Sequence, residues 1–146
     1  MSLERITKCV VEEDKKKFSI NDPGTGRRAT ISVGARKCQK IQVDGQLLEI
    51  VPCRCDWCIR DKGNADCLFV ELKGNDCKHA AEQICNTIRW FSSKVVPFQL
   101  ASCAYIVANS GIPRLNSTIQ NAIAKIGQKY KIKLVFTHSP AQLKFP

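Results

Sequence analysis

The hydrophobic period of the chain changes at Gly74, and this change constrains the fold more than any other feature. Before it, Cys67–Lys73 is a short apolar run bounded by turn residues, which predicts a strand. After it, apolar residues recur at helical spacing and predict a helix of about four turns. A chain with this junction must pack a helix against a sheet. The apolar positions of the helix are Cys77, Ala81, Ile84, Cys85, Ile88 and Phe91.

The rest of the chain supplies more strands and a second helix. The first 28 residues are poorly patterned, and only a short helix over 3–13 is suggested there. A second amphipathic helix runs from Asn116 or Ser117 to Tyr130. This order favours one α/β domain over 1–146, a mixed β-sheet flanked by helices. Strands are predicted over 30–33, 41–43, 47–59 (one strand, or two interrupted near Pro52), 98–107 and 132–136.

The charge of the chain suits a polyanionic partner. Lys and Arg number 23 against 13 Asp and Glu, a formal net charge of +10, and nucleic acid is the first candidate, DNA more than RNA. A long apolar run, an N-terminal signal region and a lipidation box are all missing, so we expect a soluble, cytoplasmic protein without membrane contact. The nine cysteines are an odd count without a secretory signal, which predicts reduced thiols that fill the core.

The strand before Gly74 belongs to a predicted β-hairpin with a two-residue turn at Gly63-Asn64. Such a turn pairs Lys62 with Ala65, and every further pair keeps the same sum of residue numbers, so Asp56 lies opposite Glu71. Residues directly opposite in an antiparallel pair share a face, with Cβ atoms about 5 Å apart. A register slip of one residue would move Asp56 to the other face.

Two carboxylates placed side by side on a sheet repel each other, and something positive must lie between them. Lys73, two residues after Glu71 on the same face, meets part of that need. Mg²⁺ or Mn²⁺ fits better, because such ions bind one or two carboxylates plus water and phosphate oxygens. The predicted chemistry is metal-assisted hydrolysis of a phosphodiester, with Lys73 positioning the attacking water or stabilising charge on phosphorus.

Asp56, the hairpin, Phe69-Val70-Glu71-Leu72-Lys73-Gly74, a helix and a strand follow one another in an order that resembles the PD-(D/E)XK nuclease superfamily over about residues 41–109. The resemblance implies a restriction-endonuclease-like fold and a Mg²⁺-dependent endonuclease acting on DNA, in repair or defence. It also implies that Asp56 and Glu71 hold the metal and that Lys73 assists the water.

Some members of this superfamily add a Gln from the helix after the sheet and a Glu from a helix before it. Gln83 matches the first, with His79 four residues earlier on the same side of the helix. The second could match Glu4, Glu12 or Glu13. Two residues depart from the pattern: Cys55 replaces the Pro before the Asp, and Thr87 replaces a Tyr found in some branches.

Basic residues outside the hairpin are candidates for phosphate contacts, which position a duplex without reading its sequence. A loop at Gly24–Arg28 could cradle phosphate with backbone amides and guanidinium groups. A nuclease of 146 residues has little additional surface, so a homodimer or a partner protein could supply specificity. The candidate contacts are Arg27, Arg28, Lys37, Lys40, Lys125 and Lys129.

Two alternatives come from other classes of protein. The first is a catalytically silent nucleic-acid-binding or inhibitory protein of the same fold, in which Asp56, Glu71 and Lys73 form a salt-bridge cluster. The second is a zinc or redox module at Cys53, Cys55 and Cys58. Alternation along an extended strand argues against zinc, because Cys58 would face away from the other two thiols.

Overall fold

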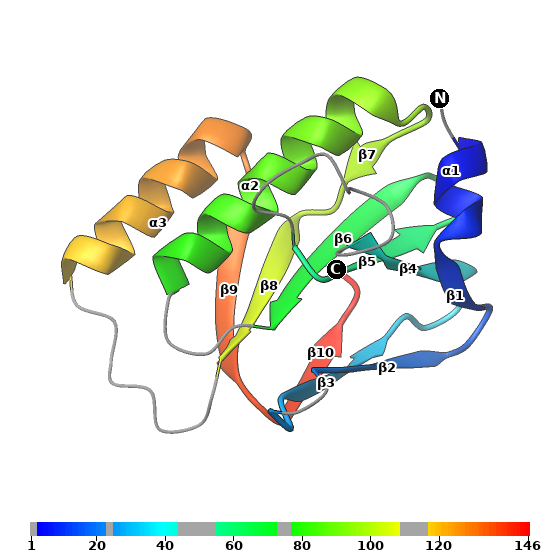
Figure 1. Ribbon diagram of the computed structural model, residues 1–146, viewed down its shortest axis with the longest axis horizontal. Helices are drawn as coiled ribbons and strands as arrows, with labels where there is room; N and C mark the ends of the chain where they lie inside the picture. Colours follow the sequence, from blue (N-terminus) through cyan, green and yellow to red (C-terminus); the bar gives the residue numbers. More distant parts are fainter. Residues whose placement is uncertain (1–2, 23–24, 44–54, 73–76, 109–116) are drawn as a thin grey trace.

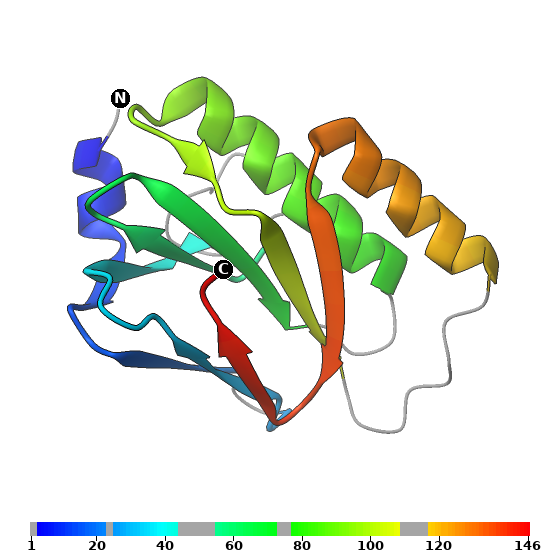
Figure 2. The same ribbon diagram turned by 180° about the vertical axis from the view of Figure 1, so that it is seen from behind.

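Three layers build the protein in the computed structural model, which describes residues 3–22, 25–43, 55–72, 77–108 and 117–146 (Figures 1 and 2). Helices α2 (Cys77–Lys94) and α3 (Ser117–Tyr130) lie side by side over one face of a large sheet, and the short helix α1 (Leu3–Lys8) lies at its far edge. A small sheet covers the opposite face. The large sheet is therefore buried on both sides.

The large sheet is mixed and has seven strands. Its first four strands in spatial order are antiparallel, whereas β6, β8 and β9 are parallel to one another. A short strand, β7 (Gln99–Leu100), pairs with the beginning of β6. The spatial order is β1 (Val10–Glu13), β4 (Cys38–Gln42), β5 (Trp57–Asp61), β6 (Asp66–Leu72), β8 (Cys103–Ala108) and β9 (Lys133–His138).

The small sheet joins segments from both ends of the chain. Its central strand is β3 (Arg28–Ser32), which pairs antiparallel with β2 (Lys17–Asn21) and parallel with β10 (Ala141–Lys144). Phe18, Ile31 and Leu143 form one apolar row across it and face the large sheet. Alternate residues point outward and are polar.

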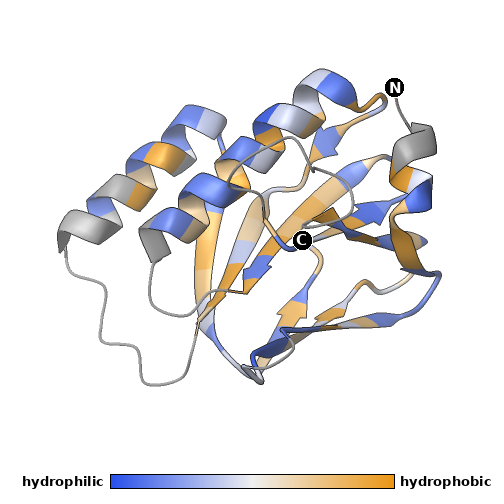
Figure 3. Ribbon diagram, viewed as in Figure 1, coloured by the Kyte–Doolittle hydropathy of each residue, from blue (hydrophilic) through white to orange (hydrophobic). Residues whose placement is uncertain are grey.

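Two apolar cores fill the spaces between the layers. The helix-side core centres on Phe69 of β6, whose ring meets that of Phe91 on α2 edge-on at 5.0 Å. The sheet-side core contains Ile59, Leu68 and the apolar row of the small sheet. Figure 3 shows this distribution, with hydrophobic residues concentrated in β6, β8 and β9.

The predicted α/β class and the mixed sheet with flanking helices are confirmed. All three described helices contribute to the helix-side layer, and the small sheet takes the other face. The first 28 residues contain α1, β1, β2 and the start of β3 rather than an unpatterned segment. The predicted helix over 3–13 ends at Lys8, because the β-branched Val10 and Val11 favour a strand.

Other boundaries differ in smaller ways. The predicted strand over 98–107 is divided into β7 and β8, and the strand over 47–59 is described only from residue 55, with β5 continuing to Asp61. The second helix and the final strand were predicted within a few residues of α3 and β9. Strands β2 and β10 were not predicted.

The β5–β6 hairpin has the predicted register and a different turn. Trp57 pairs with Val70 and Arg60 with Cys67, as the predicted sum of residue numbers requires. The turn is longer than two residues: the Ala65 N–H donates to the Asp61 carbonyl oxygen at 2.9 Å, and Ala65 has a φ of 67°. One extra residue on each side of the turn leaves the register unchanged.

Candidate functional site

Asp56 and Glu71 both lie at the open end of this hairpin. Asp56 directly precedes β5, and the Leu72 N–H donates to its Oδ2 at 2.9 Å. Its carboxylate therefore takes the place of a main-chain acceptor opposite β6, one residue beyond Glu71. Glu71 is only 2% exposed and alternates with Phe69 and Cys67, so it points toward the helix layer. Both residues lie at the same end of the sheet.

This end of the sheet is where the parallel strands finish and α2 begins. In the parallel register, Glu71 is paired with Ile106 of β8, and Ile106 is paired with Phe136 of β9. Figures 1 and 2 show the arrowheads of these strands and the first turn of α2 on the same side of the molecule. The amino end of a helix carries a partial positive charge, which favours anionic groups nearby.

Thr87 connects α2 to the segment that carries Asp56. Its side chain is fully buried; Oγ1 donates to the Gln83 carbonyl oxygen at 2.8 Å and accepts the Cys55 N–H at 2.9 Å. Residues four apart share a helix face, so Gln83 lies on the side of α2 that faces Cys55 and Asp56. The sequence prediction missed this role of Thr87, although a hydroxyl within the apolar positions of α2 was a signal for it.

Of the other predicted catalytic residues, Lys73 lies outside the described residues, as does the Glu4 side chain. Gln83 is half-buried on α2, with its Oε1 inside the protein. Glu12 lies on β1, at the far edge of the sheet. Lys15 and Lys40 pair with Glu12 and hold the pKa of its carboxyl below the usual range. Glu13 accepts a hydrogen bond from Gln39, so neither β1 carboxylate joins Asp56 and Glu71.

The donor set at this place suits a hard divalent cation. Two carboxylates are what Mg²⁺ commonly takes from a protein, with water and phosphate oxygens completing the coordination. Within the described ranges no cluster of three or more His, Cys, Asp or Glu side chains has the geometry to hold a metal.

The predicted phosphate contacts are spread over several surfaces. Arg28 is exposed near the carboxyl ends of the parallel strands, while Arg27 pairs with Asp22 at 2.5 Å. Lys37 is exposed at the opposite end of the sheet, where its carbonyl oxygen accepts the Lys62 N–H. The helix α3 exposes the remaining two, Lys125 and Lys129.

The prediction for Lys40 is wrong. Lys40 is 8% exposed, and its Nζ donates to the Ser19 carbonyl oxygen at 2.6 Å and to Glu12 at 3.0 Å. The same ammonium lies 4.6 Å from the centre of the Trp57 ring. Lys40 joins the two sheets and is not available to a phosphate group.

The seven cysteines whose side chains the structure describes are free and buried, and Cys53 lies outside the described residues. Cys55 and Cys58 both belong to the helix-side core, contrary to the strand-alternation argument, because the strand begins only at Trp57. Burial, and next the neighbouring Cys67, raise the pKa of the Cys58 thiol well above its usual value. Burial also raises the pKa of Cys38 and Cys85 to about 11. These buried thiols pack as small apolar groups of the core.

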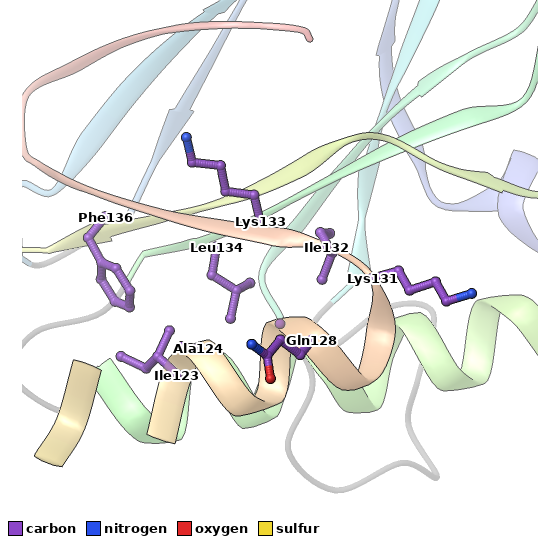
Figure 4. A pocket seen from close by; sticks show the side chains of 9 residues that line it. Ile123, Ala124, Gln128, Lys131, Ile132, Lys133, Leu134 and Phe136 are labelled. Carbon is purple, nitrogen blue, oxygen red and sulfur yellow. The ribbon is translucent and has the colours of Figure 1, made fainter. Parts of the chain in front are cut away.

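A groove of about 620 Å³ lies elsewhere, between α3 and the edge strand β9. Figure 4 shows Ile123, Leu134 and Phe136 lining it, with Lys131 and Lys133 beside them. None of its lining residues is acidic, so this groove lacks the ligands that the metal chemistry needs.

Comparison with known proteins identifies no relative: no protein-family model matches the chain, and no curated protein or solved structure matches it. Across the described ranges, no helix combines the length and apolar character that crossing a membrane requires.

Proposed function

We propose that this protein is a metal-dependent nuclease that hydrolyses phosphodiester bonds in DNA. The observation that carries the proposal is the hairpin register, which brings the Asp56 carboxylate to β6 beside Glu71. Carboxylates at one end of a sheet repel each other, and a cation shared between them would remove that repulsion. Glu71 is buried, whereas Asp56 is half-buried and accepts the Leu72 N–H.

The arrangement of elements adds support. The resemblance to the PD-(D/E)XK nucleases implies that a helix follows the Glu strand and returns the chain to a strand beside it. Here α2 follows β6, and β8 lies parallel to β6. The net charge of +10 favours a polyanionic substrate.

In the proposed reaction, Asp56 and Glu71 would hold Mg²⁺ or Mn²⁺, with Gln83 on α2 as the further candidate residue. The ion would supply charge neutralisation at the scissile phosphate and activation of water. The Leu72 N–H orients the Asp56 carboxylate through its hydrogen bond to Oδ2. Lys73 would direct the attacking water and stabilise the charge that develops on the phosphoryl oxygens.

The test is cleavage of supercoiled and branched DNA after chelation and add-back of Mg²⁺ or Mn²⁺. We expect metal-dependent cleavage by the wild type and a loss of about 100-fold or more in Asp56→Asn, Glu71→Gln and Lys73→Ala. Glu82→Gln is the matched control, because Glu82 is an exposed carboxylate on α2. This control variant should cleave like the wild type.

A wild type that binds these DNAs and leaves both DNA and RNA intact with either metal would overturn the nuclease proposal in favour of a binding or inhibitory protein. Metal titration by calorimetry provides a second readout. The wild type should bind Mg²⁺ or Mn²⁺, and Glu71→Gln should not, with circular dichroism verifying that the variant is folded.

A further inference from the structure

The outer face of the small sheet has an unusual composition. Eight side chains point outward from its three strands, and all are exposed or half-buried. Three are cations and the other five are hydroxyl or amide side chains; none is acidic and none is aromatic. They are Lys17, Ser19 and Asn21 on β2, Arg28, Thr30 and Ser32 on β3, and Gln142 and Lys144 on β10.

The strand register arranges these side chains in rows. Lys17 pairs with Ser32, which pairs with Lys144, so two ammonium groups flank a hydroxyl in one row. Neighbouring strands are about 4.8 Å apart, which separates the two lysine backbones by roughly 10 Å. Arg28 lies at the other end of β3, roughly 13 Å from Ser32. The three cations thus lie around the five hydroxyl and amide side chains of this face.

This basic face reaches the end of the large sheet that carries Asp56 and Glu71. The Arg28 N–H donates to Ser139 Oγ at 2.9 Å, and the Ser139 N–H donates to the Ala108 carbonyl oxygen at 2.8 Å. Ala108 ends β8, the strand beside β6. Figures 1 and 2 both place the β2–β3 connection at the arrowhead end of β6 and β8.

We propose that the outer face of the small sheet binds the sugar–phosphate backbone of duplex DNA. Lys and Arg pair with phosphate, and Ser, Thr, Asn and Gln donate hydrogen bonds to phosphate and sugar oxygens. Single-stranded nucleic acid is usually held by stacking on aromatic side chains, which this face lacks, so it suits a duplex. Binding here is independent of sequence, because contacts to phosphate and sugar do not read the bases.

This inference names the substrate surface for the proposed nuclease, but its test does not require cleavage. A labelled DNA duplex of about 30 base pairs is titrated at several salt concentrations in chelator, using Lys17→Gln/Arg28→Gln/Lys144→Gln. We expect the plot of log K against log salt to become less steep, its negative slope shrinking in magnitude by about 2 to 3, because each lost phosphate contact removes about one unit. Affinity for single-stranded DNA should be lower than for the duplex.

Lys8→Gln/Lys94→Gln/Lys131→Gln is the matched control, since it removes the same charge from three exposed lysines on other surfaces. Its slope should change by less than about one. Equal losses in the two triple variants would overturn the proposal, as would a triple variant that loses binding to anionic phospholipid vesicles and keeps its affinity for the duplex. Thermal melting of both variants should match the wild type, because all six side chains are exposed.

The two proposals can fail separately. If the Lys17, Arg28 and Lys144 variant cleaves DNA and binds the duplex like the wild type, the nuclease proposal stands and the DNA-binding role of this face is refuted. If salt-dependent duplex binding requires these three residues but no metal supports cleavage, the DNA-binding role of the face stands and the nuclease proposal is refuted.

Discussion

At the scale of single residues, Thr87 has the clearest structural role near the candidate site. Its hydroxyl accepts a hydrogen bond from the buried Cys55 N–H and donates one to the Gln83 carbonyl oxygen. Because Cys55 directly precedes Asp56, the position of the Asp56 backbone depends on this bond. Thr87 is a positioning residue, since it acts through Cys55.

Replacing Thr87 by Val should leave the Cys55 N–H buried without its acceptor and reduce the free energy of unfolding by about 1–3 kcal/mol. If Asp56 holds a metal, Thr87→Val should also weaken metal binding, whereas Thr87→Ser should retain most of it. Urea denaturation and metal titration measure the two effects.

Ser92→Ala is the matched control, because the Ser92 hydroxyl also bonds a helix carbonyl but is exposed. Metal affinity in Thr87→Val equal to that of the wild type would show that the hydroxyl serves stability alone.

At the scale of elements, α3 ends in a tight connection to β9. The Ile132 N–H donates to the Gly127 carbonyl oxygen at 2.9 Å, and Lys131 between them has a φ of 54°. This is the Schellman arrangement that ends many helices. The helix and the strand approach so closely that a Cβ on Gly127 would lie 2.7 Å from the Ile132 carbonyl oxygen.

Gly127→Ala should therefore destabilise the protein by about 1–3 kcal/mol, through steric overlap with main-chain atoms. The sign of the change in stability is informative, because replacing Gly by Ala within an ordinary helix stabilises it by about 1 kcal/mol. Urea denaturation measures the change, and Gln128→Ala, at an exposed neighbouring position, should alter stability by less than about 0.5 kcal/mol. A more stable Gly127→Ala would mean that α3 and β9 can move apart.

The turn of the β5–β6 hairpin depends on Asp61. The Arg36 guanidinium lies 2.7 Å from its Oδ2, and the Gly63 N–H donates to its Oδ1 at 2.7 Å. Burial works to raise the pKa of the Asp61 carboxyl, but Arg36 and the Gly63 N–H outweigh it and leave the pKa below its usual value. The folded protein thus favours the ionised carboxylate.

Because the pKa of Asp61 is lowered in the folded state, its ionised carboxylate stabilises the fold at pH values above the pKa of Asp in the unfolded chain, about 3.9. This stabilisation is lost as the pH falls through the lower pKa of the folded state. Asp61→Asn should be less stable than the wild type at pH 7, by about 1–2 kcal/mol. The difference should shrink between about pH 4 and pH 2, as the wild type takes up the proton. Urea denaturation across this range measures it; a constant difference would mean that Asp61 acts through shape and not charge. Asp14→Asn, which removes the exposed ion pair with Lys62, should change stability little.

The same hairpin illustrates what could be predicted from sequence. Its register followed from turn residues and strand alternation, which are local, and the longer turn did not disturb it because one residue was added on each side. The pairing of Asp56 with β6 was therefore predictable. The positive φ of Ala65 was not, because alanine has no preference for that conformation.

Long-range pairing explains most of what was missed. Strand β2 has only Phe18 and Ile20 as buried apolar residues, which is too short an alternation to recognise. Strand β10 owes its place to β3, at the other end of the chain. The error at Lys40 has the same origin, because Glu12, Ser19 and Trp57, which hold it, come from three other segments.

At the scale of the whole molecule, the two cores share the large sheet, so both sides should unfold together. Ile31 is fully buried at the centre of the small sheet, between Phe18 and Leu143. Ile31→Ala should lower the free energy of unfolding by about 2–5 kcal/mol while keeping a single transition.

Two tryptophans report on this cooperativity, because Trp57 packs against the sheet-side core and Trp90 against the helix-side core. Trp57→Phe and Trp90→Phe leave one fluorophore on each side, and their urea transitions in the Ile31→Ala background should coincide. Thr30→Ala, at a neighbouring outward position, is the control. Separate midpoints would mean that the small sheet melts as its own unit.

The parallel pairing of β10 with β3 also sets an order in time. A ribosome adds roughly 5–20 residues each second, so β3 emerges many seconds before the strand that covers its edge. During that interval the nascent chain presents an open strand edge and the apolar row that later faces the large sheet. Pairing between distant segments is slow to form, and this protein should be most vulnerable to aggregation while it is still being made.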